Sequence, residues 1–165
     1  MSKSHYLKPL KHKHHEVVKN VYINAIQEIG PLSYTDQQIA AWSSLAVLPG
    51  VLDESLEKGK GLVSFEGKEI AAFAVRYPLN RLALLYCRAS FSRRGHATRL
   101  LNYIEFKAWE EGQKNLYTEA SIFSYPLLIK RGWDVIRNEF IEIGGVRFKR
   151  YRMQKELGSP SINPS

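Results

Sequence analysis

The hydrophobic positions of the chain follow a helical period in four segments. In the most regular of these, Leu100, Leu101 and Ile104 fall three and four positions apart and share one helix face, while charged residues occupy the opposite face. Another segment begins at Thr35 with Gln38 three positions later, which is the capping-box pattern of a helix start. The predicted helices are residues 16–29, about 35–45, 95–111 and 125–131.

Shorter apolar segments, separated by glycine-containing turns, predict strands. Gly67 lies between the first two such segments, and Gly144 and Gly145 lie between the last two, where a tight hairpin needs backbone conformations that glycine adopts easily. The predicted strands are residues 61–65, 69–77, 82–88, 115–120, 135–143 and 146–154, with a loop at 48–60. Helices and strands in this order predict an α+β fold with mostly antiparallel strands.

Length and composition predict one domain. The 165 residues, of which 44% are hydrophobic and 24% charged, suffice for one core. We expect the domain to comprise residues 1–157 and a flexible tail to comprise residues 158–165. No segment approaches the roughly 20 apolar residues of a membrane span. The start of the chain lacks the pattern of a secretory signal, and Cys87 has no second cysteine to pair with, so we expect a cytoplasmic protein without membrane contact.

The net charge of +8 restricts the class of partner. The 24 lysine and arginine residues are spread along the chain without a long block or a nucleic-acid motif, so we expect no nucleic-acid partner, whereas a phosphate-rich ligand fits the charge. His12, His14 and His15 alternate with lysines that repel cations, and helical spacing does not bring all three to one face. We therefore expect a solvated, basic helix start there and no metal site.

One segment carries the features of an anion site. Gly95 stands at the start of the longest predicted helix. Glycine lets the backbone approach a ligand closely, and the first helical amides have no partner inside the helix. Arg93, Arg94 and the hydroxyl of Thr98 add donors, and the set favours a pyrophosphate over a base edge or a carboxylate. The alternative is a loop in which the glycine only starts a helix and the arginines are solvated.

This segment resembles the pyrophosphate loop of the GNAT-type N-acetyltransferases, which reads Gln/Arg-x-x-Gly-x-Gly/Ala and falls here on residues 92–97. Other segments resemble further parts of the same family, in the same order and at fitting separations. They are residues 34–35 with 41–42 on the acceptor side, 84–87 on the strand before the loop, 118–121 on the next strand, 124–126 and 131–133 around the short helix, and 152–155 on the last strand.

The resemblance implies the GNAT-like acyl-CoA N-acyltransferase fold, an α+β architecture with a mixed, mostly antiparallel, splayed sheet and helices on both faces. It implies acetyl-CoA as the acetyl donor and direct attack of an amine acceptor on the thioester, with the oxyanion held by a strand amide near Cys87. The residues that it places on the cofactor are Tyr86, Cys87 and Arg88 on the strand, Arg93, Arg94, Gly95, His96, Ala97 and Thr98 in the loop and helix start, and Ser121 and Ser124, which alternatively cap the short helix.

Three positions depart from the family pattern. Ser92 replaces a Gln or Arg, and Ala83 replaces an acidic residue. Leu128 stands where many relatives have the tyrosine that protonates the leaving thiolate. Tyr125 is the candidate for this acid, and Tyr86 is a second, although both are compatible with a simple packing role.

Glu119 is the predicted base. It lies among apolar strand neighbours, where desolvation would raise the pKa of its carboxyl and let it take a proton from the acceptor. A structural carboxylate that bonds backbone amides is the alternative. Cys87 is not expected to form a covalent intermediate, because direct transfer needs none and lone buried cysteines are usually inert.

Tyr34 and Trp42 are predicted to line the acceptor pocket, although an amphipathic core stripe explains Trp42 equally well. The expected acceptor is a small-molecule or peptide amine, and the expected assembly a monomer or homodimer. A non-catalytic acyl-CoA sensor or partner-binding module is the alternative function, motivated by Ala83 and Leu128.

Overall fold

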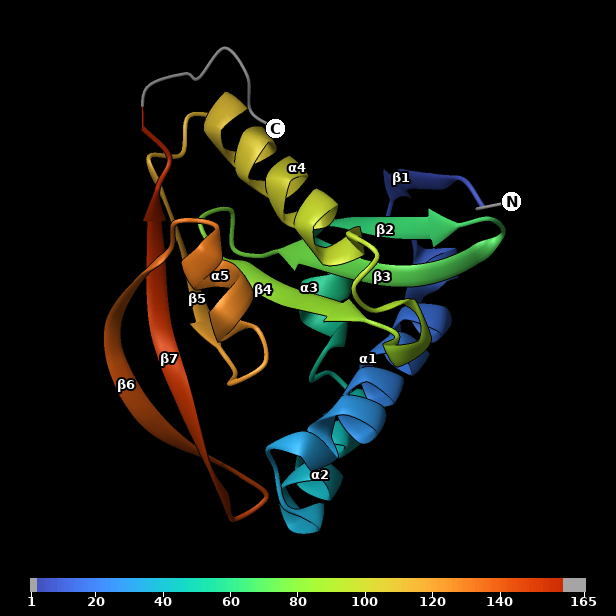
Figure 1. Ribbon diagram of the computed structural model, residues 1–165, viewed down its shortest axis with the longest axis vertical. Helices are drawn as coiled ribbons and strands as arrows, with labels where there is room; N and C mark the ends of the chain where they lie inside the picture. The colour runs from blue at the N-terminus through green and yellow to red at the C-terminus, as the bar shows by residue number, and fades with distance from the viewer. Residues whose placement is uncertain (1–2, 159–165) are drawn as a thin grey trace.

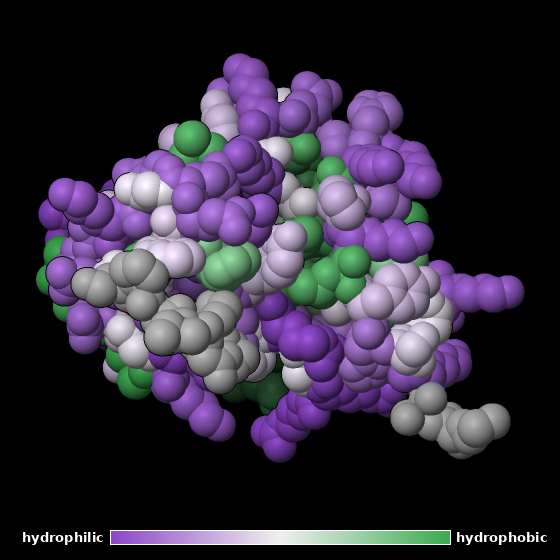
Figure 2. Space-filling view, turned by 90° about the horizontal axis from the view of Figure 1, so that it is seen from above, coloured by the Kyte–Doolittle hydropathy of each residue, from purple (hydrophilic) through white to green (hydrophobic). Residues whose placement is uncertain are grey.

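The computed structural model describes residues 3–158 and contains two antiparallel sheets with helices around them (Figure 1). In the part of the chain that it describes, no helix has both the length and the apolar character needed to cross a bilayer. The face seen from above is mainly hydrophilic, with smaller hydrophobic areas between the polar residues (Figure 2).

The first sheet has the strand order β1-β2-β3-β4. Its strands are β1 (His5–Pro9), β2 (Lys60–Glu66), β3 (Glu69–Arg76) and β4 (Leu82–Cys87), each antiparallel to its neighbour. In β3 every residue after Glu69 is buried, because helices cover both faces of this central strand. That double burial explains why the sequence of β3 is an almost continuous apolar run.

The second sheet has the strand order β5-β7-β6. It contains β5 (Asn115–Ala120), β6 (Asp134–Ile143) and β7 (Val146–Glu156). Gly144 and Gly145 join the last two strands with φ angles of 55° and 79°, which only glycine adopts without strain in such a two-residue turn. Strand β7 pairs with β5 on one side and with β6 on the other, so β7 is the central strand.

The two sheets meet at one end and separate toward the other. The amide of Tyr117 donates to the carbonyl of Asn80 at 2.9 Å, and the hydroxyl of Thr118 donates to the carbonyl of Leu82 at 2.7 Å. A single isolated parallel bridge in the described residues joins Arg81, which directly precedes β4, to Tyr117 of β5. Beyond it the strands diverge, as Figure 1 shows, which confirms the predicted splayed α+β fold.

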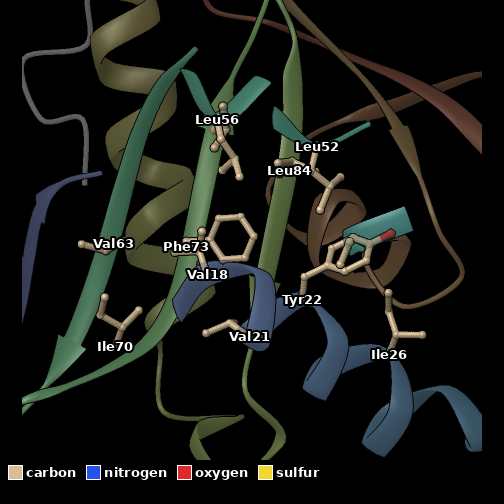
Figure 3. Packing of buried hydrophobic residues seen from close by; sticks show 12 residues of the cluster. Val18, Val21, Tyr22, Ile26, Leu52, Leu56, Val63, Ile70, Phe73 and Leu84 are labelled. Atoms are coloured by element: carbon tan, nitrogen blue, oxygen red, sulfur yellow. The ribbon is translucent and has the colours of Figure 1, made fainter. Parts of the chain in front are cut away.

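Helices cover both faces of the first sheet, as predicted. On one face, Val18, Val21 and Tyr22 of α1 pack against Phe73 and Leu84 (Figure 3). The α-helices are α1 (His15–Ile29), α2 (Asp36–Ser43), α3 (Asp53–Lys58), α4 (His96–Glu110) and α5 (Tyr125–Lys130). Short 3-10 helices occupy His12–His14, Gly30–Leu32, Ser44–Ala46 and Ala89–Phe91.

The other face of the first sheet packs against α4. Ala72 and Ala74 of β3 are fully buried there, opposite Leu100 and Leu101 of α4, in a cluster that also contains Trp133. Alanine at these two positions lets the helix lie close to the strand. The second sheet and α5 contribute to the same cluster, so one core fixes α4 and the two sheets relative to one another.

The predicted helices and strands agree with the structure to within a few residues, but two elements were missed. Residues 48–60 were predicted as a loop, whereas they contain α3, and β1 was not predicted at all. The prediction of a solvated helix start holds for Lys11, His12 and Lys13, which are exposed, but it was wrong for His14 and His15, which are 9% and 8% exposed. His14 faces inward to accept the amide of Lys11 through Nδ1. The predicted tail lies, apart from Gly158, outside the described residues.

Candidate functional site

A cavity of about 400 Å³ opens where the two sheets separate. Its walls come from α1, α2, β4, β5, α5 and the β6–β7 hairpin. Of the residues predicted from the sequence, the cavity brings together Tyr34, Trp42, Tyr86, Cys87, Ala97, Glu119, Ser121 and Ser124. The side chains therefore leave an open cavity in the gap between the strands.

The end of β4 directs one backbone amide into this gap. The amide of Arg88 donates to the carbonyl of Ala71 in β3 at 2.8 Å, so this N–H belongs to the sheet. Successive residues of an antiparallel strand direct their backbone groups to opposite edges. The amide of Cys87 consequently points to the free edge of β4, toward the cavity, whereas the amide and side chain of Arg88 are engaged with β3.

The side chains beside this edge are not suited to nucleophilic attack. Burial raises the pKa of the Cys87 thiol to about 11, so the thiol is protonated near neutral pH. Burial also raises the pKa of the Tyr86 hydroxyl, whose ring packs against Tyr22 at a centroid distance of 4.6 Å. What the strand offers a ligand here is its backbone.

The loop before α4 has the geometry of an anion cradle. Gly95 occupies the N-cap position with φ 86°, in the left-handed region, and gives α4 no side-chain cap. The first helical hydrogen bond runs from the amide of Arg99 to the carbonyl of Gly95 at 3.0 Å. The amides of His96, Ala97 and Thr98 precede that bond and stand at the positive end of the helix dipole. A side chain at position 95 would crowd the guanidinium of Arg99, 3.1 Å from the Cβ position.

The side chain of His96 turns away from this cradle and lies 1% exposed beneath it. Its Nδ1 is 2.7 Å from Oγ of Ser64, and its Nε2 is 3.1 Å from Oε1 of Glu66. Glu66 also pairs with Arg94 of the loop and, at 2.7 Å, with His5 of β1. The loop is thus tied to β1 and β2 through one buried carboxylate that the sequence did not reveal, because it lies far away along the chain.

These groups also resemble a metal site in composition. Ligand atoms of His5, Glu66 and His96 lie within 4.8 Å of one another. Two guanidinium groups contact the same side chains: Arg94 pairs with Glu66, and Arg99 lies 2.7 Å from Nδ1 of His5. A divalent cation would have to sit beside both of them. The cluster is explained as a hydrogen-bonded network, and we assign no metal to it.

Ser121 and Ser124 close the turn between β5 and α5. Oγ of Ser124 accepts the amide of Ser121 at 3.0 Å, and Oγ of Ser121 accepts the amides of Phe123 and Ser124 at 3.2 Å. These bonds stabilise the turn before α5, but they do not cap the helix: Ser124 is its N-cap residue and makes no side-chain cap bond. Both residues still line the cavity, so their outer faces remain next to the space for a ligand.

The carboxylate of Glu119 is paired with two arginines. Nε of Arg81 donates to Oε2 at 2.8 Å, and Nη1 of Arg152 lies 3.8 Å from Oε1. The side chain is 17% exposed and lines the cavity. The sequence placed it among apolar neighbours, but its nearest partners are cations from β7 and from the segment before β4.

Tyr125 lies apart from the cavity. Its ring packs against Tyr151 at a centroid distance of 4.5 Å, in the second core cluster. Among the described residues of α5, Leu127 and Leu128 line the cavity and Tyr125 does not. The tyrosine that was predicted as the acid is therefore in a packing position.

Tyr34 and Trp42 form an aromatic wall together with two residues that the sequence did not reveal, Phe123 and Phe148. The centroid of Tyr34 lies 5.2 Å from Trp42, 5.3 Å from Phe123 and 6.0 Å from Phe148. Burial raises the pKa of the Tyr34 hydroxyl, which accepts the amide of Ile122 at 3.2 Å. The four rings come from three distant segments, around residues 34–42, 123 and 148, which is why no single motif contained them.

Comparison with known proteins gives a consistent picture. The family model of the acetyltransferase (GNAT) domain matches residues 32–156. An uncharacterised N-acetyltransferase of Escherichia coli K12, YafP, is 24% identical over 134 residues, which cover 81% of this chain and 84% of that protein.

Two solved structures share the fold. A GCN5-related N-acetyltransferase from Rhodopseudomonas palustris superimposes with a TM-score of 0.88 at 20% identity, covering 94% of this chain and 98% of the other. The PaiA N-acetyltransferase from Thermoplasma acidophilum, solved in complex with coenzyme A, gives a TM-score of 0.73 at 15% identity, with 93% and 99% covered.

Proposed function

Because the chain belongs to the GNAT acetyltransferase family and is an N-acetyltransferase that uses acetyl-CoA as its donor, we propose that it passes the acetyl group directly to a small primary amine bound between α2 and the β6–β7 hairpin. The observation that carries this proposal is the gap between β4 and β5, which runs from the amides at the start of α4 to the aromatic wall.

The free edge of β4 supports direct transfer. The amine nitrogen attacks the thioester carbon and the carbonyl oxygen becomes an oxyanion; the carbonyl then re-forms as the C–S bond breaks, and coenzyme A leaves as the thiolate, which takes up a proton. The amide of Cys87 is the donor that faces the oxyanion. Attack by Cys87 itself is disfavoured, because its thiol is protonated near neutral pH.

We propose the following cofactor contacts. The pyrophosphate binds the amides of Gly95, His96, Ala97 and Thr98, with Arg93 and Arg94 at its edge. The pantetheine lies along residues 86–88 and beside Ser121 and Ser124. In this arrangement the backbone supplies most of the bonds, so Ser92 in place of the usual Gln or Arg does not remove the cradle.

Glu119 is proposed to receive the proton of the acceptor. The ion pairs with Arg81 and Arg152 hold its carboxylate in place at the wall of the cavity. In Glu119→Gln, kcat should fall about 100-fold or more, because general-base catalysis contributes on this order. An unchanged kcat would leave Glu119 with the structural role alone. Tyr125 stays a prediction as the acid; Tyr125→Phe should lower kcat only if the ring leaves Tyr151 during the reaction.

We also propose a domain organisation, an assembly and a location for the protein. We expect residues 1–157 to act as one domain, as a monomer or homodimer in the cytoplasm. The acceptor is a small-molecule amine in preference to a peptide amine, for the reasons given below.

The experiment that tests the proposal is calorimetric titration with acetyl-CoA. The Gly95→Glu variant should lose binding, because bulk and negative charge would fill the cradle. Gly112→Glu is the matched control: Gly112 also has a positive φ, 90°, and a Cβ there would meet no atom within 4 Å. Equal affinity in the two variants would contradict the cradle.

A non-catalytic acyl-CoA sensor is the second candidate. The paired state of Glu119 and the leucines at the start of α5 favour it, because neither presents a free acid or base to the reaction. Tight binding of acetyl-CoA without release of free thiol, across amines of several classes, would support this alternative against the enzyme.

A further inference from the structure

The acceptor end of the cavity has three properties that together define a class of substrate. The inference rests on the proposed function and concerns only which amine is used. The first property is the aromatic wall, defined as Tyr34, Trp42, Phe123 and Phe148. Its rings offer apolar faces, and the hydroxyl of Tyr34 is occupied by the amide of Ile122. Such a wall binds a flat apolar group better than a hydrated chain.

The second property is closure. Nε2 of Gln38 in α2 donates to the carbonyl of Arg147 in β7 at 3.0 Å, so the helix and the hairpin touch across the end of the cavity. The contacts of Tyr34 with Phe123 and Phe148 join the same two sides. The cavity of about 400 Å³ must also hold the acetyl end of the cofactor. A peptide chain would have to break the bridge between Gln38 and Arg147, whereas a small molecule would not.

The third property is an excess of positive charge. Phe148, Arg150 and Arg152 lie on the same face of β7, because residues two apart in a strand point the same way. Arg152 lies opposite Glu119 in β5, and Arg150 lies opposite Glu139 in β6. Four arginines and two carboxylates form a charged strip. Its arginines are Arg81 before β4, Arg137 in β6, and Arg150 and Arg152 in β7, and its carboxylates are Glu119 and Glu139.

Glu139 is the shared partner within this strip. Nε of Arg152 donates to it at 2.8 Å, Nε of Arg137 lies 3.6 Å away, and Arg150 bonds its other oxygen. Hydrogen bonds from Arg152 and Arg150 hold the pKa of the Glu139 carboxyl below its usual range. One carboxylate cannot neutralise three guanidinium groups. The strip as a whole therefore keeps positive charge in excess, and Arg150, although bonded to Glu139, is the member of it that lines the cavity beside Phe148.

We propose that the acceptor is a small primary amine that carries both a flat apolar group and an acidic group. The apolar group packs on the aromatic wall, Arg150 binds the acidic group, and the amine points along Glu119 to the thioester. The excess positive charge disfavours polyamines, which would bring further ammonium groups to the same strip. It also favours the neutral form of the attacking amine, because a cationic surrounding opposes protonation.

The test compares matched probes by release of coenzyme A thiol. Phenylalanine contains all three groups, phenethylamine lacks only the carboxylate, and alanine lacks only the ring. Spermidine and the peptide Phe-Ala-Ala-Ala represent the excluded classes. We expect kcat/KM for phenylalanine to exceed that of every other probe at least about tenfold, since a site built around a charged group discriminates strongly against analogues that lack it.

Arg150→Gln separates charge recognition from general damage. It should lower kcat/KM for phenylalanine about tenfold more than for phenethylamine, because only the former loses an ion pair. Lys68→Gln, on the exposed turn between β2 and β3, removes the same charge far from the strip and should leave the ratio of the two probes as in the wild type.

The outcomes distinguish this inference from the proposed function. Turnover in which spermidine, the peptide or phenethylamine equals or exceeds phenylalanine would overturn the substrate class and leave the acetyltransferase intact. An unchanged ratio in Arg150→Gln would overturn the role of that arginine. Binding of acetyl-CoA without turnover of any probe would overturn the proposed enzyme and, with it, the class of acceptor.

Discussion

Nε2 of the buried His96 lies 3.1 Å from Oε1 of Glu66, which joins the first turn of α4 to the end of β2. The same carboxylate pairs with Arg94 in the cradle loop and with His5 in β1. Burial opposes ionisation of Glu66, but the hydrogen bond from His96 and the charges of Arg94 and His5 outweigh it and hold the pKa of the carboxyl below its usual range. The conformation of the loop before α4 therefore depends on a buried carboxylate from β2.

In Glu66→Gln, the Kd for acetyl-CoA should rise about tenfold, because the neutral amide cannot hold the guanidinium of Arg94 and the imidazole of His96 together. Once the cofactor is saturating, kcat should change much less. Calorimetry and initial rates measure the two effects. Glu69→Gln, an exposed change on the neighbouring strand, is the control. A fall in kcat with Kd intact would show that Glu66 acts on the chemistry instead.

The buried histidines predict a loss of stability on acidification. Burial lowers the pKa of His96 from its ordinary value of 6.5, and it does the same for His14 and His15. Below pH 6.5 the unfolded chain therefore binds more protons than the folded chain, so the free energy of unfolding falls as the pH falls through this value toward the folded pKa.

Thermal unfolding measured from about pH 8 to about pH 5 tests this effect, because histidine titrates within roughly this range. The Tm should decrease steadily below about pH 6.5. His96→Gln, which keeps a polar side chain without the titration, should make the decrease shallower, and His12→Gln, at an exposed position, should not. A Tm that rises on acidification would contradict the assignment.

The thiol of Cys87 should react slowly with iodoacetamide at neutral pH. Burial raises its pKa to about 11, so the thiolate is scarce until the solution becomes strongly alkaline. Because the chain contains one cysteine, the mass increase reports this site alone. Acetyl-CoA should slow the labelling further by covering the edge of β4. Rapid labelling at neutral pH would reopen a covalent mechanism.

Thr35→Ala should lower the free energy of unfolding by about 1 kcal/mol, the usual cost of a lost N-cap. Oγ1 of Thr35 accepts the amide of Gln38 at 3.1 Å, and Oε1 of Gln38 accepts the amide of Thr35 at 3.0 Å. Urea denaturation measures the change, with Ser33→Ala as the control, because Ser33 is exposed and ends the 3-10 helix Gly30–Leu32 through its backbone amide, which the substitution keeps. An effect equal to that of Ser33→Ala would show that the box contributes nothing.

The sequence predicted the parts of the fold whose signals are local. The period of α4, the glycines of the turns and the cap at Thr35 all lie within a few residues of the structure they determine. Strand β1 was missed because it is an edge strand with few buried side chains. It includes His5, Lys8 and Pro9, which are unusual in a strand interior. Helix α3 was missed because it buries a single residue, Leu56.

The candidate site was predictable to the same extent. The backbone cradle at Gly95 is contained in one short segment, so its pattern was visible. The partners of the side chains were not: Glu66 reaches His96, and Arg152 reaches Glu119, across long stretches of chain. Glu119 was expected to have an apolar surrounding, but strand register brings Arg152 opposite it. Such pairings follow from topology, which local patterns do not contain.

The divergence of β4 and β5 leaves a strand edge in the interior with backbone groups that no neighbouring strand completes. In the proposed arrangement an extended pantetheine chain lies along that edge as a removable strand, so the cofactor would also complete the sheet. Saturation with acetyl-CoA should then stiffen the seam between the two halves and raise the melting temperature. The empty protein, by contrast, carries an edge of the kind that recruits other chains, and its tendency to associate should fall when the cofactor is added.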